Sequence, residues 1–110
     1  MIEKPHSSTD DAAEAAIFAA ELGKVPEIDL HGMTQNVALS ELEAFFHSEL
    51  FTGTEVIKII HGRGDQILRN AIYRWLREPE QSDLIVKFRD SQNPAQQGAV
   101  TYVALHRLRS

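Results

Sequence analysis

One short apolar run limits the possible folds more than any other part of the sequence. Val56 to Ile60 is apolar except for one lysine, and a glycine-rich turn, His61-Gly62-Arg63-Gly64, follows it directly. Beyond the turn, apolar residues recur at helical spacing. A strand that is apolar on both sides and passes straight into a helix is typical of a central strand in an α/β fold. We predict a strand over 55–60 and then a helix that Asp65 can cap, running to about Arg77 and stopped by Pro79.

The same layout occurs earlier in the chain. Ile28-Asp29-Leu30-His31-Gly32 is a short alternating stretch that also ends in histidine and glycine. Apolar residues at helical spacing follow it as far as Phe51, and Thr34 stands at the expected N-cap. The sequence therefore predicts a strand over 28–31 and a helix from the Thr34 cap to Phe51. Two consecutive strand–helix units predict parallel strands joined by a right-handed crossover.

Two more strands and an extra helix complete the predicted elements. Alternating and β-branched residues predict strands over 84–89 and 100–106, with a polar loop over 90–99. Residues 1–7 are expected to be a disordered tail, and an alanine-rich helix follows from the Ser8 region to Leu22, before Pro26. Because this helix has few large apolar residues, we expect it to pack on the domain or on a second copy of it.

The predicted order β-α-β-α-β-β defines an α/β fold. We expect a two-layer sandwich, in which two core helices cover one face of a four-stranded mixed sheet, plus the extra N-terminal helix. The chain is accordingly divided into a tail and alanine-rich helix over 1–26 and a folded domain over 27–110.

Composition excludes several classes of protein. The chain has 110 residues, enough for one domain with a modest core. It has no cysteine, so disulfides and thiolate metal sites are excluded. No apolar run approaches the ~20 residues that span a bilayer, and acidic residues stand where a secretory signal would be basic. We therefore expect a cytoplasmic protein with no membrane partner.

The net charge of −5 is unevenly distributed along the chain. Residues 58–77 contain five basic residues against the single acid Asp65. The acidic total therefore does not exclude a nucleic-acid-binding protein. The alternative is that these arginines are only the solvated side of a helix. The basic residues of this segment are Lys58, Arg63, Arg69, Arg74 and Arg77.

The two His-Gly turns are expected to form one site. If the two strands are parallel neighbours, both turns lie at the carboxyl edge of the sheet, where ligands bind in such folds. Both helix N-termini then offer free N–H groups to an anion at this edge. The side chains brought together would be Asp29 and His31 from the first turn, and His61 and Arg63 from the second.

Three chemistries fit this set of groups. In the first, a histidine acts as general acid or base on a phosphodiester, Asp29 orients it, and Arg63 with the glycine amides neutralises the phosphate. In the second, Asp29, His31 and His61 bind a divalent metal such as Mg²⁺ or Mn²⁺, which activates water. In the third, the turn binds phosphate and catalyses nothing.

The two motifs resemble those of the Smr (small MutS-related) domain family. Asp29-Leu30-His31-Gly32 and His61-Gly62-Arg63-Gly64 match the two markers of the family, and Leu68-Arg69 matches a Leu-Arg pair after the second marker. The resemblance covers residues 27–106. It implies a two-layer α/β fold, nucleic-acid binding and, in many members, endonuclease activity on DNA or on RNA, including mRNA on stalled ribosomes.

The resemblance also implies roles for individual residues. The catalytic pair would be Asp29 and His31. Because the ATPase and clamp regions of the larger relatives are lacking, we expect a stand-alone Smr protein whose partner is DNA or RNA, or a ribosome. The residues that would bind phosphate or nucleic acid are Gly32, His61, Gly62, Arg63, Gly64 and Arg69.

Two positions depart from the family pattern. Gln66 stands where the family usually has glycine, and Gln96-Gln97-Gly98-Ala99 replaces a Gly-Gly-x-Gly run before the last strand. Because glycines let a nucleic-acid backbone approach closely, two functions stay open. The first is an endonuclease that acts on DNA or RNA phosphodiesters, and the second is a non-catalytic nucleic-acid- or ribosome-binding module.

Overall fold

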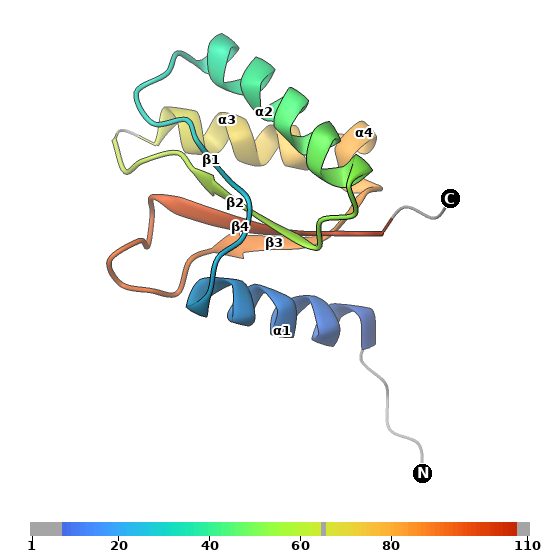
Figure 1. Cartoon of the computed structure of the whole chain (residues 1–110). Helices are drawn as coiled ribbons and strands as arrows, with labels where there is room; N and C mark the ends of the chain where they lie inside the picture. The colour runs from blue at the N-terminus through green and yellow to red at the C-terminus, as the bar shows by residue number, and fades with distance from the viewer. Residues whose placement is uncertain (1–7, 65, 108–110) are drawn as a thin grey trace.

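The computed structural model describes residues 8–64 and 66–107 (Figure 1). The tail over 1–7 and the predicted cap Asp65 lie outside these residues. No helix in the described ranges is long and apolar enough to cross a membrane. In chain order the elements are α1 (Ser8–Leu22), β1 (Glu27–Asp29), α2 (Gln35–Phe51), β2 (Val56–Ile60), α3 (Ile67–Leu76), α4 (Pro79–Ser82), β3 (Ile85–Asp90) and β4 (Val100–Leu105).

The strands form a four-stranded mixed sheet in the order β1-β2-β4-β3. β1 and β2 are parallel, with Asp29 opposite Ile60. β4 lies between β2 and β3 and is antiparallel to both of them. Its six residues are all buried, as expected for a strand that is covered on both faces. The predicted α/β fold with a mixed four-stranded sheet is confirmed.

Helices cover both faces of the sheet. α2 and α3 lie side by side on one face, and α1 crosses the other (Figure 1). Beneath α2 and α3 lies the larger core, in which Phe46 meets Trp75 edge to face at a ring distance of 5.4 Å. The smaller core, beneath α1, is built around Ile17 and Tyr102, which are 0% and 2% exposed.

The N-terminal helix therefore packs on its own domain, one of the two arrangements that the sequence allowed. Its contacts are partly ionic, because β3 directs basic side chains toward the acidic residues of α1. Lys87 lies 2.8 Å from Glu14, and Arg89 lies 2.7 Å from Glu21. The hydrogen bond from Lys87 lowers the pKa of Glu14, and Arg89 lowers it further. These pairs fix α1 across the sheet although it contributes few large apolar residues.

Most predicted boundaries agree with the structure to within one or two residues. The first strand is shorter than predicted, because the chain leaves the sheet after Asp29. α3 ends at Leu76, and the short helix α4, which begins at Pro79, was not predicted. Its proline stands in the first turn, where a missing N–H costs nothing. Thr34 is the N-cap of α2, as predicted, whereas the N-cap of α3 is Gln66.

Candidate functional site

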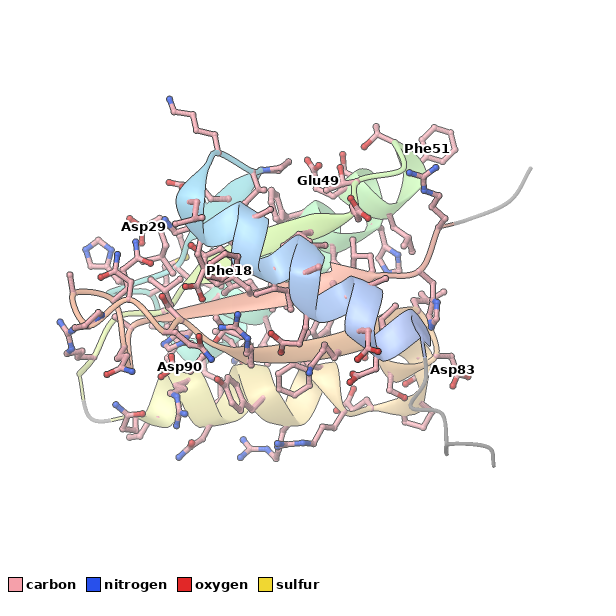
Figure 2. All side chains as sticks on the ribbon, turned by 90° about the horizontal axis from the view of Figure 1, so that it is seen from below. Phe18, Asp29, Glu49, Phe51, Asp83 and Asp90 are labelled. Carbon is pink, nitrogen blue, oxygen red and sulfur yellow. The ribbon has the colours of Figure 1, made fainter. Side chains whose placement is uncertain are left out.

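The pairing of β1 with β2 brings the two His-Gly turns into contact. Beyond the last paired residues, the N–H of Leu30 still donates to the carbonyl of Ile60 at 2.7 Å. Both turns therefore begin at the same edge of the sheet, as predicted. A Cβ built on Gly62 would lie only 3.0 Å from the Cβ of His31, so a larger residue at this position would have to displace His31. Figure 2 shows Asp29 at the same end of the molecule as Asp90, with Phe51 at the opposite end.

Asp29 and His31 form a hydrogen-bonded pair on the surface. Nδ1 of His31 lies 2.6 Å from Oδ1 of Asp29, and the backbone N–H of His31 donates to the same oxygen at 3.1 Å. The two side chains are 51% and 68% exposed, so a ligand can reach both. The bonds from His31 hold the pKa of the Asp29 carboxyl below its usual value. Because a carboxylate only accepts, the neutral imidazole carries its proton on Nδ1 and keeps the Nε2 lone pair.

The first turn leads directly into the N-terminus of α2. Gly32 has a φ of +81°, which reverses the chain after His31 and which glycine adopts without strain. Thr34 then caps the helix, since its Oγ1 accepts from the N–H of Val37 at 3.4 Å. The end of a helix carries a partial positive charge. The N-terminus of α2, which favours anions, therefore begins three residues after His31.

His61 lies inside the fold and not on the surface of the site. Its side chain is buried, with Nε2 2.9 Å from Oγ1 of Thr101 and Nδ1 3.1 Å from the carbonyl of Gly62. Thr101 also lies 3.0 Å from the hydroxyl of Tyr73. Burial lowers the pKa of His61, and the charge of Arg69 lowers it further, so the ring is neutral near pH 7. Both ring nitrogens are used within the protein, which differs from the expectation that His61 contacts phosphate.

Thr101 and Tyr73 were not identified from the sequence as part of this site. They hold His61, and His61 in turn holds the carbonyl of Gly62. One signal was present, because Thr101 is polar within a strand that is otherwise apolar and fully buried. A buried polar side chain requires a partner, and that partner is a histidine forty residues earlier in the chain.

The glycine-rich turn is fastened to the loop between β3 and β4. The backbone N–H groups of His61 and Gly62 both donate to the carbonyl of Ala99 at 3.0 Å. The Arg63 side chain reaches the same loop, where Nε donates to the carbonyl of Gln97 at 3.1 Å and a terminal nitrogen to that of Ala95 at 3.0 Å. These carbonyls orient the guanidinium but do not neutralise it, so Arg63 remains an exposed positive charge beside the turn.

The structure does not assemble the metal-binding set considered from the sequence. Within residues 8–64 and 66–107, no group of three or more histidine, cysteine, aspartate or glutamate side chains could hold a metal ion. The physical reason is that His61 turns inward to Thr101, whereas Asp29 and His31 bond to each other at the surface. Of the three proposed metal ligands, only Asp29 and His31 could therefore contact the same ion.

Comparison with known proteins agrees with this arrangement. The model of the Smr domain matches residues 28–106, which contain both turns and the whole sheet apart from Glu27. The chain belongs to the Smr domain family. The match begins at β1, so α1 lies outside the part that defines the family.

Proteins named endonuclease MutS2 contain similar Smr sequences. One from Caldanaerobacter subterraneus subsp. tengcongensis is 36% identical over 81 residues, which are 74% of this chain and 10% of that protein. Another, from Solidesulfovibrio magneticus, is 43% identical over 54 residues, which are 49% of this chain and 7% of that protein. The chain thus spans about a tenth or less of the length of these relatives.

Solved Smr structures have the same fold. The Smr domain of Thermus thermophilus MutS2 is 32% identical, has a TM-score of 0.68, and is matched over 74% of this chain and 99% of that one. YdaL, a stand-alone small MutS-related protein from Escherichia coli, has a TM-score of 0.73 over 96% of this chain and 80% of its own. At 22% identity, the likeness to YdaL shows the fold alone.

The backbone conformation at position 66 explains why the Smr family usually has glycine there. Gln66 has a φ of +74°, and it is the one non-glycine residue with positive φ among those described. The left-handed backbone costs about 1 kcal/mol for a residue with a Cβ. The side chain makes two hydrogen bonds. Its Nε2 donates to the carbonyl of Arg63 at 2.9 Å, and its Oε1 accepts from the guanidinium of Arg69 at 3.3 Å. Gln66 thus keeps the turn conformation that glycine would provide and adds a link to α3.

Proposed function

We propose that this protein binds nucleic acid and cleaves its phosphodiester bonds as an endonuclease. Membership of the Smr family supports the proposal, as do the relatives named endonuclease MutS2. Because the chain matches only a small part of those relatives, their activity does not transfer to it without a test of its own. The observation that carries the proposal is the exposed pair of Asp29 and His31, joined at 2.6 Å.

In this proposal His31 is the general base and Asp29 orients it. The carboxylate fixes the proton on Nδ1, so Nε2 can take a proton from the attacking oxygen, which is water or the 2′-hydroxyl of RNA. As that oxygen bonds to phosphorus, the P–O bond to the leaving oxygen breaks, and the leaving oxygen takes up a proton from solvent. The charge on Asp29 also stabilises the imidazolium that then forms. A histidine is suited to this step near neutral pH, and a carboxylate kept ionised by its hydrogen bonds is suited to the supporting role.

The phosphate would lie between the two turns, against Arg63 and the N-terminus of α2. Gly32 and Gly64 carry no side chain that would block it, and nothing lies within 4 Å of a Cβ built on either. His61 and Gly62 contribute by shape, since His61 holds the turn against β4. Arg69, at the start of α3, adds charge beside the turn.

No step of this mechanism passes through a divalent ion such as Mg²⁺ or Mn²⁺. The donor set fits a protein-built metal cage poorly, because the described residues contain no group of three suitable side chains. Asp29 is the one carboxylate of the pair, and its Oδ1 already accepts two bonds from His31. Activity measured with and without a chelator tests metal dependence directly.

The test is cleavage of labelled RNA, single-stranded DNA and supercoiled plasmid by the full chain. Asp29→Asn preserves the shape of the pair but removes its charge, and His31→Ala removes the base. We expect each to lower the cleavage rate by about 100-fold or more, the usual contribution of a positioned base. His106→Ala is the matched control, because His106 is exposed at the end of β4 and distant in sequence from both turns.

The outcome separates the two functions considered from the sequence. Cleavage that His31→Ala and Asp29→Asn abolish, while His106→Ala retains it, supports the endonuclease. If the unmodified protein binds these nucleic acids in a salt-dependent way but cuts none of them, the endonuclease proposal fails and a binding module, for nucleic acid or for the ribosome, takes its place.

A further inference from the structure

The basic side chains of this acidic protein are distributed unequally between the two faces of the sheet. On the α1 face, the basic side chains of β3 are neutralised, since Lys87 and Arg89 contact the carboxylates of α1. On the opposite face, α3 and its C-cap together carry three arginines and no acidic residue. Among the described residues, none of these arginines has a carboxylate within 4.0 Å. They are Arg69, Arg74 and, at the C-cap, Arg77.

Two of these arginines lie on aromatic rings. The guanidinium carbon of Arg69 is 4.6 Å from the ring centre of Tyr73, and that of Arg77 is 5.7 Å from the same ring. Arg77 also lies 5.4 Å from the ring of Phe88 on β3. Tyr73 and Phe88 meet edge to face at 5.1 Å, so the four side chains form one continuous row. Contact with a ring orients a guanidinium while its charge stays available to a ligand.

A hollow lies at the far end of this row. It has a volume of about 280 Å³, and its lining includes Arg77, Phe88, Leu76 and Ile85. Its walls therefore combine an aromatic ring, aliphatic side chains and a guanidinium. Figure 2 shows long nitrogen-tipped side chains projecting from α3 away from the rest of the molecule.

We infer that this surface, formed by the outer side of α3 with Phe88, binds a single-stranded segment of nucleic acid next to the cleavage site. The inference rests on the proposed function and adds to it a second contact region and a strand preference. Proteins that bind single strands combine a positive track for the phosphates with planar groups on which bases stack. Arg69, Arg74 and Arg77 supply the track, and the Arg77–Phe88 hollow supplies a place for a base.

The position of α3 relative to the candidate site supports this assignment. The N-cap of α3, Gln66, stands two residues after Gly64, and the ten residues of the helix extend about 15 Å from the turn. That length corresponds to about four phosphates at the ~3.4 Å axial spacing of a stacked strand. A strand whose scissile phosphate lies at the turn would therefore meet the arginines in succession. The whole chain has a net charge of −5, so the protein outside this basic surface is acidic and repels a polyanion, which directs the strand to this surface.

The experiment measures binding with His31→Ala as the parent protein, so that cleavage does not interfere. Labelled single-stranded RNA, single-stranded DNA and duplex DNA are titrated between about 50 and 200 mM salt. The test variant is Arg74→Gln with Arg77→Gln. The control is Lys24→Gln with Arg107→Gln, which removes the same charge from exposed positions outside α3.

We expect the α3 variant to bind single strands about tenfold more weakly, and the slope of log affinity against log salt to fall by about 1.4, the value for two lost phosphate contacts. The control should change affinity less than twofold. Because Arg77 also packs on rings, Arg74→Gln alone is measured too, and a smaller loss in the same direction is expected. Melting curves show whether each variant is folded.

Several results would overturn the inference. These are equal weakening by the α3 variant and the control, no weakening by the α3 variant, or tighter binding of duplex than of single strands. The proposed endonuclease can fail separately. If the unmodified protein cuts nothing but binds single strands through α3, the inference stands without it. If the unmodified protein cuts, and Arg74→Gln with Arg77→Gln introduced into the unmodified protein leaves both cutting and binding unchanged, the endonuclease stands without the inference.

Discussion

His31 occupies the space that a side chain on Gly62 would need. A Cβ built on Gly62 would lie 3.0 Å from the Cβ of His31, and the φ of Gly62 is +83°. The two sequence motifs are therefore in van der Waals contact, although thirty residues separate them. Glycine is favoured at this position of the second turn because its φ is positive and the first turn lies against it.

Gly62→Ala tests this contact. The variant must adopt a left-handed φ and also displace His31, so we expect it to lower the free energy of unfolding by more than the ~1 kcal/mol that the backbone alone costs. Because the displaced side chain is His31, cleavage should fall as well. Gly53→Ala is a matched control, since Gly53 has the same φ of +83° and nothing within 4 Å of its added Cβ. Equal losses for both variants in urea unfolding would contradict the role of the contact.

His61 makes stability depend on pH in a predictable direction. Burial lowers its pKa below the ordinary value of 6.5, so below that pH the unfolded chain binds the proton more readily than the folded protein. The contribution of neutral His61 to the free energy of unfolding is fully present above pH 6.5. It decreases as the pH falls from 6.5 toward the lower pKa of the folded protein. Urea unfolding measured from about pH 8 to about pH 5 should show the decrease.

His61→Gln is the variant that isolates this effect. It should be less stable at every pH, because a buried bond to Thr101 is altered, at a cost of about 1–3 kcal/mol. Its stability should nevertheless change less between about pH 8 and about pH 5 than that of the unmodified protein. A pH dependence that is the same in both proteins would assign the titration to other groups.

Substitution of Gln66 separates backbone strain from side-chain bonding. Gln66→Ala and Gln66→Gly both remove the bonds to the Arg63 carbonyl and to Arg69, but only glycine adopts the φ of +74° without cost. We therefore expect the glycine variant to be more stable than the alanine variant by about 1 kcal/mol. Thermal melting of the two variants measures the difference. An alanine variant at least as stable as the glycine variant would show that the turn relaxes to another conformation.

Glu21 should be the acid on which the attachment of α1 depends most. Its side chain is 9% exposed, and its Oε2 accepts from Arg89 at 2.7 Å and from the N–H of Gln92 at 3.0 Å. Glu21→Gln leaves the Arg89 charge less well paired, so we expect a loss of about 1–3 kcal/mol in the free energy of unfolding. Glu43→Gln on the exposed side of α2 should stay within about 0.5 kcal/mol. Similar effects of the two substitutions would mean that the ion pairs of α1 contribute little.

Much of the fold was predictable because its signals are local. An apolar run followed by two glycines and a helical repeat specifies a strand, a turn and a helix among neighbouring residues. The contact of the two turns also followed from sequence, since consecutive strand–helix units make their strands parallel. The short α4 was missed because Pro79 indicates the end of a helix and equally the first turn of a new one.

The sequence by itself determined the two strand–turn–helix units and placed Asp29 two residues before His31, a spacing that lets a side chain bond along the chain. Tertiary structure decided the role of His61. Its direction depends on Thr101, forty residues away, which enters only when β4 inserts between β2 and β3. It also decided that α1 covers the second face, because that contact joins Glu14 and Glu21 to β3 across most of the chain. Local chemistry specifies a turn, but the burial of polar groups depends on which distant strand packs beside them.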